Sequence, residues 1–302
     1  MKTHDRLGRR LFTAKVKEPI FSRHPTQREI RWLQFLNFHR FGSTSYLHEC
    51  TADTHRCMQT TKRMLRGLFD AGLTCRPVQQ RNTADARGNE HIYALTQSGI
   101  DYLKDHDLWV DALKPNGPWV HQFMISCITA SIQLLAERSG YRFIPGHEIT
   151  KSLAAAVPFT WRGKQHSMKL IPDGLFAIEY PAGFVAYVLE ADRSTETIDP
   201  VSPYRKSVRR NVKQYKEFVG NGLYKEAYGL TCPLIVLNVA ISATHIKQSL
   251  AIIEEEVGDC SYMTYGLAPM FRTPFKPPKE LLSRLFTGDL LRCGCEPIQM
   301  KR

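Results

Sequence analysis

The chain has 302 residues, of which 43% are hydrophobic and 23% charged, a globular composition that excludes a mainly disordered, collagen-like or coiled-coil protein. At about 150 residues per domain, this length favours two domains. No apolar run reaches the ~18–20 residues that cross a bilayer, and the basic start MKTHDRLGRR leads into no apolar signal segment. We therefore expect a soluble, cytoplasmic protein that does not contact membranes.

Positive charge is concentrated in the N-terminal third. The chain has 41 Lys and Arg against 29 Asp and Glu, a net charge of +12. Residues 1–100 hold 17 of the basic and 8 of the acidic side chains, which is a net charge of +9. This asymmetry favours a polyanion as the partner of that part, most simply nucleic acid. A basic surface without a specific partner is the alternative.

The same third has the pattern of three helices, a hairpin and a fourth helix. Helices are predicted from Thr26, over SYLHEC after the capping residues 42–44, and from near Thr54 to Gly72. The segment RPVQQRNTADARGNEHIYALT predicts two short strands around a polar loop, and ALTQSGIDYLKDH predicts a closing helix. This order is that of a winged helix-turn-helix.

A winged helix would place its third helix in the major groove of double-stranded DNA. One polar face of that helix has the spacing i, i+3, i+4, i+7 and consists of Arg56, Gln59, Thr60 and Arg63. On the hairpin, Arg81 and Arg87 would contact phosphates or the minor groove. A protein-contact domain is the alternative, but the Arg/Gln/Thr face and the charge favour DNA.

Beyond the Pro- and Gly-containing segment 114–118, the pattern becomes that of an α+β domain. A long apolar helix is followed by a β-hairpin over 174–180 and 184–192, a basic helix over 203–219 and a fully buried strand over 232–241. We therefore predict an α+β protein with these parts: a basic N-terminal arm (1–25), a winged-helix domain (26–113), a second domain (119–272) and a C-terminal tail (273–302).

Three carboxylates stand at the ends of the predicted hairpin. Asp173 precedes its first strand, while Glu190 and Asp192 lie two residues apart in its second, so that their side chains share a face. Converging carboxylates repel one another unless a cation joins them, and oxygen ligands favour Mg²⁺ or Mn²⁺. We therefore expect these three to hold a divalent metal that activates water for phosphodiester cleavage. The alternative is an inactive fold in which they pair with Arg193 and Lys206.

The pattern of Pro172-Asp173, Glu190-x-Asp192 and a basic helix with Tyr215 resembles the PD-(D/E)xK nuclease superfamily. A winged helix followed by PDG…LEADRSTET…RKSVRRNVKQY is similar to the replication-relaxation family, and through it to the MobC-type relaxases of mobilisable plasmids. The resemblance implies a restriction-endonuclease-like fold for the second domain. It also implies a role for His121, which matches a histidine at the start of that family's long helix.

One position departs from the superfamily pattern. The E-x-K motif has a lysine that orients water and stabilises developing charge, where this chain has Asp192. We expect Lys206, from the following helix, to take that role. Tyr215, in the element Asn211-x-x-x-Tyr215, would contact a phosphate or attack one covalently.

The basic helix would bind the DNA backbone beside the carboxylates, although a merely solvated face is the alternative. It has six cations in twelve residues without an acid, and the expected phosphate contacts include Arg205, Arg209, Arg210 and Lys213.

The sequence thus predicts a metal-dependent DNA-nicking or DNA-cleaving protein, a relaxase or endonuclease of a mobile genetic element that acts in mobilisation or replication. Its partners would be double-stranded DNA and other proteins of those processes, and its place in the cell would be at the nucleoid. A catalytically inactive, sequence-specific regulator of transcription or plasmid replication is the alternative. A protein-docking scaffold would leave the charge asymmetry unexplained.

Overall fold

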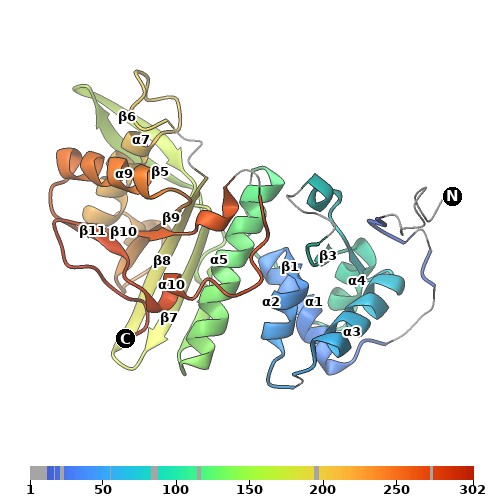
Figure 1. Cartoon of the computed structure of the whole chain (residues 1–302). Coiled ribbons are helices and arrows are strands. Elements are labelled where there is room, and N and C mark those ends of the chain that lie inside the picture. Colours follow the sequence, from blue (N-terminus) through green and yellow to red (C-terminus); the bar gives the residue numbers. More distant parts are fainter. Residues whose placement is uncertain are drawn as a thin grey trace. The chain divides into compact units, whose positions relative to one another are not determined.

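The computed structural model describes residues 12–16, 18–20, 24–54, 56–82, 88–113, 117–193, 197–272 and 275–302. The chain forms two compact units, one of residues 1–110 with 274–280 and the other of residues 111–273 with 281–302. Helices and sheets occur in both units, so the protein is of mixed α+β class (Figure 1). The segment expected to be a tail, 273–302, is divided between the two units.

The N-terminal unit combines helices with a small antiparallel sheet in the strand order β1-β3-β2. Gly42 pairs with Tyr93, and Thr74 pairs with Leu95. The described elements are α1 (Gln27–His39), β1 (Gly42–Ser43), α2 (Thr44–Cys50), α3 (Met58–Asp70), β2 (Thr74–Cys75), the 3₁₀ helix η1 (Val78–Asn82), β3 (Ile92–Leu95) and α4 (Gln97–Asp105).

Side-chain caps define where the first helices of this unit begin. Thr26 and Glu29 form a capping box at α1, and the Ser43 hydroxyl accepts the Tyr46 N–H at α2. The third helix starts at Met58 rather than near Thr54, because the N–H and hydroxyl of Thr54 both donate to the Thr51 carbonyl in a turn.

The first predicted strand of the hairpin is largely replaced by the 3₁₀ helix η1. There the Gln80 side chain pairs with both backbone groups of Ile92, at 3.0 Å each. A side-chain amide thus takes the place of a strand partner, which the residue pattern does not reveal.

The second unit is built on a six-stranded mixed sheet in the order β11-β10-β9-β8-β7-β4. β9 lies in its middle, parallel to both of its neighbours, as its continuous apolar run predicts. The elements that lead to and include the central hairpin are α5 (Trp119–Arg138), β4 (Arg142–Pro145), α6 (Gly146–Ile149), β5 (Ala155–Trp161), β6 (Lys164–Leu170), β7 (Gly174–Tyr180) and β8 (Gly183–Asp192). They are followed by α7 (Val208–Tyr215), the π-helical turn η2 (Lys216–Gly220), α8 (Tyr224–Tyr228), β9 (Leu234–Ala240), α9 (Ala243–Glu256), β10 (Cys260–Leu267), η3 (Pro269–Phe271), α10 (Arg284–Thr287) and β11 (Leu291–Cys293).

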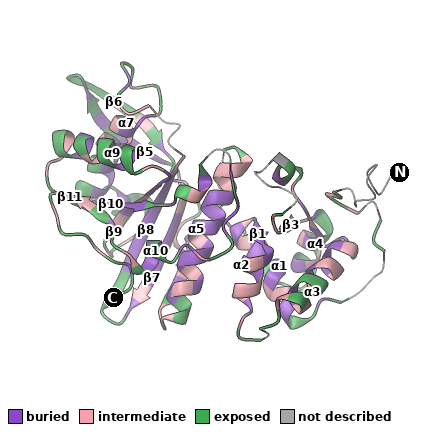
Figure 2. Cartoon of the chain, in the orientation of Figure 1, coloured by how far each residue is buried: buried purple, intermediate pink, exposed green. Residues whose placement is uncertain are grey.

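Helices cover both faces of this sheet. α5 lies on one face and α7 and α9 lie on the other, so the central strands are buried between them (Figures 1 and 2). By length and composition α5 could cross a membrane, which the sequence analysis did not expect, but 61% of its most apolar window is buried inside the protein. Its burial is that of a core helix.

Two parts of the second unit were not predicted. β5 and β6 form a separate two-stranded antiparallel sheet that packs against α7, and β11 pairs with β10 at the edge of the main sheet. β5 has alternate buried residues, from Ala155 to Trp161. The sequence analysis assigned no strand to the first part and treated the second as tail.

Candidate functional site

The hairpin of β7 and β8 brings Asp173 beside the end of β8. The register pairs Gly174 with Leu189, and the Asp173 N–H donates to the Leu189 carbonyl at 2.9 Å. One oxygen of its carboxylate, Oδ2, accepts the backbone N–H of Ala191 at 2.8 Å. The Asp173 side chain is therefore held by backbone contacts next to Glu190.

The other oxygen of Asp173 contacts His121. His121 Nε2 lies 3.1 Å from Asp173 Oδ1, and both side chains are mostly buried. His121 is in the first turn of α5, so the helix on one face of the sheet reaches the end of the hairpin. The family resemblance named this histidine, and the structure joins it to the candidate aspartate.

Glu190 is buried, at 6% exposure, and has two partners from the segment around α7. The Tyr215 hydroxyl donates to its Oε1 at 2.5 Å, and Lys206 Nζ lies 3.6 Å from its Oε2. Lys206 precedes α7 and is about half exposed, so it lies between the carboxylate and solvent. The sequence analysis expected this lysine within the helix, whereas it lies two residues before α7.

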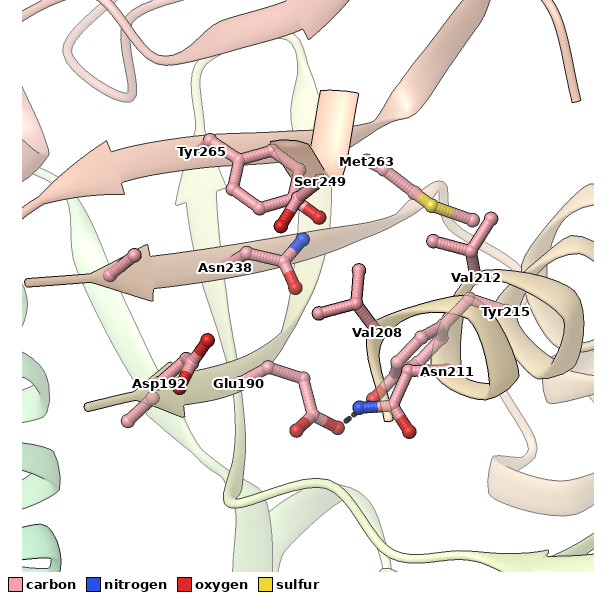
Figure 3. Close-up of a pocket in the computed structure, with 12 residues that line it drawn as sticks. Glu190, Asp192, Val208, Asn211, Val212, Tyr215, Asn238, Ser249, Met263 and Tyr265 are labelled. Carbon is pink, nitrogen blue, oxygen red and sulfur yellow. Dashed lines mark hydrogen bonds between the residues drawn. The ribbon is translucent and has the colours of Figure 1, made fainter. Parts of the chain in front are cut away.

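Asp192 points to the same side of β8 but pairs with His245 on α9. Beside it, Asn238 of β9 lies in register with Glu190. Glu190, Asp192 and Asn238 line a cavity of about 30 Å³ between the sheet and α7 (Figure 3). Apolar side chains such as Val208, Val212 and Met263 also line it, and its volume is about that of one water molecule.

The three carboxylates do not form the single metal centre that the sequence analysis predicted. Within the described part of the chain, no group of three or more His, Cys, Asp or Glu side chains is arranged to hold a metal ion. The reason is that the partners differ: Asp173 contacts His121, Glu190 contacts Tyr215 and Lys206, and Asp192 contacts His245.

Tyr215 is not placed to attack a phosphate, which corrects one of its two expected roles. Its side chain is 2% exposed and its hydroxyl is occupied by Glu190. Burial, together with the Glu190 carboxylate, raises the pKa of the Tyr215 phenol well above its usual value. The phenol therefore stays protonated and serves as a hydrogen-bond donor that fixes Glu190.

Replacing Tyr215 with phenylalanine should lower the free energy of unfolding by about 1–3 kcal/mol, because a buried carboxylate loses a donor. Tyr228→Phe is the matched control, since the Tyr228 hydroxyl donates to the neutral Leu153 carbonyl and its loss should have the smaller effect. Urea unfolding of both variants gives the comparison. Equal losses would contradict a larger contribution of the Tyr215–Glu190 hydrogen bond.

The basic helix does not present all its cations to solvent. Arg209, whose side chain is 13% exposed, forms ion pairs with Asp199, Glu255 and Glu256, and Lys213 also pairs with Glu256. These hydrogen bonds raise the pKa of Arg209, with Glu255 contributing most. Arg209 and Lys213 are thus structural contacts between α7 and α9 rather than phosphate contacts, because the acidic end of α9 lies against them.

The remaining predicted cations of this segment differ in exposure. Arg205 is exposed, whereas one nitrogen of Arg210 lies 3.3 Å and 3.4 Å from the carbonyls of Tyr204 and Pro203. Lys206 is exposed as well, and of these cations it is the one that contacts Glu190.

In the N-terminal unit, the predicted DNA-binding face is partly on α3. Gln59 and Arg63 are exposed and Thr60 is half-buried, while Arg56 is exposed but precedes the helix by two residues. Arg81 is exposed on η1, with its guanidinium 5.9 Å from the centre of the Phe12 ring. Arg87 lies outside the described residues.

Two polar residues of the site were missed by the sequence analysis. Asn238 is the one polar side chain in the apolar strand LIVLNVA, and His245 lies in the first turn of α9. A polar residue inside a buried strand was the signal for the first. For His245, proximity to Asp192 depends on the parallel pairing of β8 and β9 and could not be read from spacing.

Comparison with protein families matches residues 33–234 to the family described as replication-relaxation. The match covers two thirds of the chain, and the protein belongs to this family. Membership supports a DNA-processing role in replication.

A comparison with curated proteins finds no match. Among solved structures, the chain is similar to the restriction endonuclease FokI at 11% sequence identity and a TM-score of 0.28, over 81% of this chain and 42% of that one. The chain thus spans less than half of that structure, and a TM-score at this level does not establish a shared fold.

Proposed function

We propose that the protein processes DNA in replication by divalent-metal-dependent cleavage or nicking of the phosphodiester backbone. In this proposal the N-terminal unit is a winged helix that binds duplex DNA, and the second unit has a restriction-endonuclease-like fold. The observation that carries the proposal is the meeting of Asp173, Glu190 and Lys206 where β8 ends. Two acids and a lysine at one end of a hairpin are the groups that this reaction needs.

The residues at this point fit a metal bound by two carboxylates rather than three. Mg²⁺ commonly uses one or two protein carboxylates and completes its shell with water and substrate phosphate oxygens. Asp173, just before β7, and Glu190, in β8, supply such oxygens at the same end of the hairpin. Asp192, paired with His245, would remain outside the shell.

Each neighbouring side chain has a role that its contacts suggest. When bound, Mg²⁺ or Mn²⁺ would polarise the phosphodiester and favour ionisation of a water. His121 would orient Asp173, Tyr215 would orient Glu190, and the half-exposed Lys206 ammonium would stabilise negative charge on the phosphate.

A second candidate is a DNA-binding regulator with an inactive second unit. Its support is that the three carboxylates already have protein partners, His121, Lys206 with Tyr215, and His245, which can neutralise them without a metal. Structural ion pairs and catalytic clusters shift the pKa values of their ionisable groups in similar ways. In either case we propose a role in a mobile element, with other mobilisation or replication proteins as partners and a cytoplasmic, nucleoid-associated location.

Arg63→Ala should weaken binding to a cognate duplex by about 1–3 kcal/mol, roughly 5- to 150-fold, if Arg63 contacts a base from α3. Arg31→Ala is the matched control, because Arg31 lies on α1 and pairs with Asp53. Fluorescence anisotropy at several salt concentrations, on cognate and random duplexes, measures the difference. Equal affinity of the two variants would contradict α3 as the reading element.

The cleavage proposal is tested by incubating the protein with supercoiled DNA of its own replicon and Mn²⁺. We expect nicked or linear product that requires the metal and disappears with a chelator. Sequence-specific binding without product over the same range of metal concentration would favour the regulator.

A further inference from the structure

A second cavity, of about 520 Å³, lies within the N-terminal unit. It is formed by one side of α3, the start of α2 and the residues just before β3, together with Lys279. Its volume is in the range of pockets that bind small molecules. Four cations line it against a single carboxylate, that of Glu90: Lys62, Arg66, Arg76 and Lys279.

Arg76 is the buried cation of this pocket. The residue is 8% exposed, and its guanidinium lies 4.1 Å from the centre of the Phe69 ring and 5.5 Å from that of Tyr93. Its Nε is buried without a hydrogen-bond partner. A buried donor of this kind costs free energy unless an acceptor meets it, so an anion in the pocket would satisfy it.

The carboxylate in the pocket does not neutralise these cations. Glu90 is held by Ser45, through the backbone N–H and through the hydroxyl at 2.7 Å. Arg66 pairs with Asp70, but neither Lys62 nor Lys279 forms an ion pair with any residue that the structure describes. The pocket therefore carries a net positive charge that is open to a ligand.

We propose that this pocket binds a phosphate group. A phosphate oxygen would accept from Arg76, and the two lysine ammonium groups would pair with its charge, as in other phosphate sites built from Arg and Lys. The phosphate belongs either to a free nucleotide, which the volume accommodates, or to the backbone of DNA that passes along α3. The second source rests on the proposed DNA binding, whereas the first does not.

His91, which also lines the pocket, gives an independent readout. Desolvation of its ring, followed by the nearby Arg76 and Arg66, lowers its pKa to about 4. A bound anion favours the charged imidazolium, so phosphate should raise this pKa. An NMR titration of the ring with and without inorganic phosphate or ATP would detect the rise.

The test compares a Lys62→Ala/Lys279→Ala double variant with Lys104→Ala, which removes a charge from α4, outside the pocket. All three lysines are exposed, so these changes should leave the fold intact. Calorimetric titration measures the affinity for inorganic phosphate and ATP, which tests for a nucleotide site. Anisotropy with a fluorescent duplex measures the affinity for DNA, which tests for a contact with its backbone.

We expect the double variant to lose at least about tenfold in affinity for one of these probes, because two charged hydrogen bonds to the phosphate are removed, while Lys104→Ala retains the parent value. Loss with ATP identifies a nucleotide site, and loss with the duplex alone identifies the DNA backbone. No binding of phosphate or ATP at millimolar concentration, together with equal duplex affinity of the two variants, would overturn the proposal. If the parent binds no DNA at all, the proposed function fails and the ATP titration alone decides the pocket.

Discussion

Replacing Asp173 with asparagine is expected to lower metal-dependent cleavage by at least about a thousandfold, because a neutral amide binds a hard cation poorly and the metal supplies several kcal/mol of transition-state stabilisation. We expect the Asp173→Asn variant to fold as the parent does. The amide oxygen of asparagine can still accept the Ala191 N–H, so we expect a loss of no more than about 1 kcal/mol in the free energy of unfolding. Cleavage of supercoiled DNA and urea unfolding measure the two effects.

Glu179→Gln provides the matched control for this change. Glu179 lies near the other end of β7 and pairs with Arg142 at the surface, far along the strand from Asp173. Its neutralisation should leave cleavage at the parent rate. If Asp173→Asn and Glu179→Gln cleave alike, Asp173 is not a ligand of a catalytic metal.

Arg209→Ala is expected to destabilise the second unit by about 2 kcal/mol while leaving the affinity for DNA unchanged. The value is below the ~3–5 kcal/mol of a fully buried pair, because Asp199 and Glu255 remain largely exposed. Arg205→Ala, the control in the same segment, should leave stability unchanged, since Arg205 is exposed. Chemical unfolding measures the stability of the two variants, and anisotropy measures their affinity for DNA. Weaker DNA binding by Arg209→Ala without a loss of stability would show that Arg209 is a phosphate contact.

The same contact has a pH dependence of defined sign. The hydrogen bond with Arg209 lowers the pKa of the Glu255 carboxyl. The Arg209–Glu255 contact therefore contributes fully to stability above the pKa that Glu255 has in the unfolded chain. This contribution is lost as the pH falls through the lower pKa of Glu255 in the folded protein. The stability difference between the parent and Arg209→Ala should therefore shrink in acid and stay constant at neutral pH.

The sequence predicted the elements that have local signals. The β7–β8 hairpin was expected within one residue, because apolar strands flank a Pro-Ala-Gly turn, and β9 was recognised by its apolar run. The start of α3 was wrong, since Thr51 and Thr54 form a turn that competes with the helix. The β5–β6 hairpin was missed because β6 (KQHSMKL) is polar over most of its length and β5 contains a proline, Pro158.

Of the site, only the residues on the hairpin itself could be predicted, because strand periodicity determines which face they share. Period-two alternation placed Glu190 and Asp192 on one face, and the hairpin brought Asp173 beside them. The partners that distinguish these acids come from other helices, as His121 and His245 show. In the same way, the acidic end of α9, which neutralises Arg209, lies more than forty residues away in sequence.

The most direct test of the central claim is a titration of Mn²⁺ into the protein, followed by electron paramagnetic resonance with and without duplex DNA. We predict one bound Mn²⁺ per chain in the parent, tighter with DNA because phosphate oxygens complete the shell, and none in Asp173→Asn. Asp192→Asn should retain the ion, since Asp192 is paired with His245. No bound Mn²⁺ at millimolar concentration in the parent with DNA present would contradict a metal-dependent nuclease.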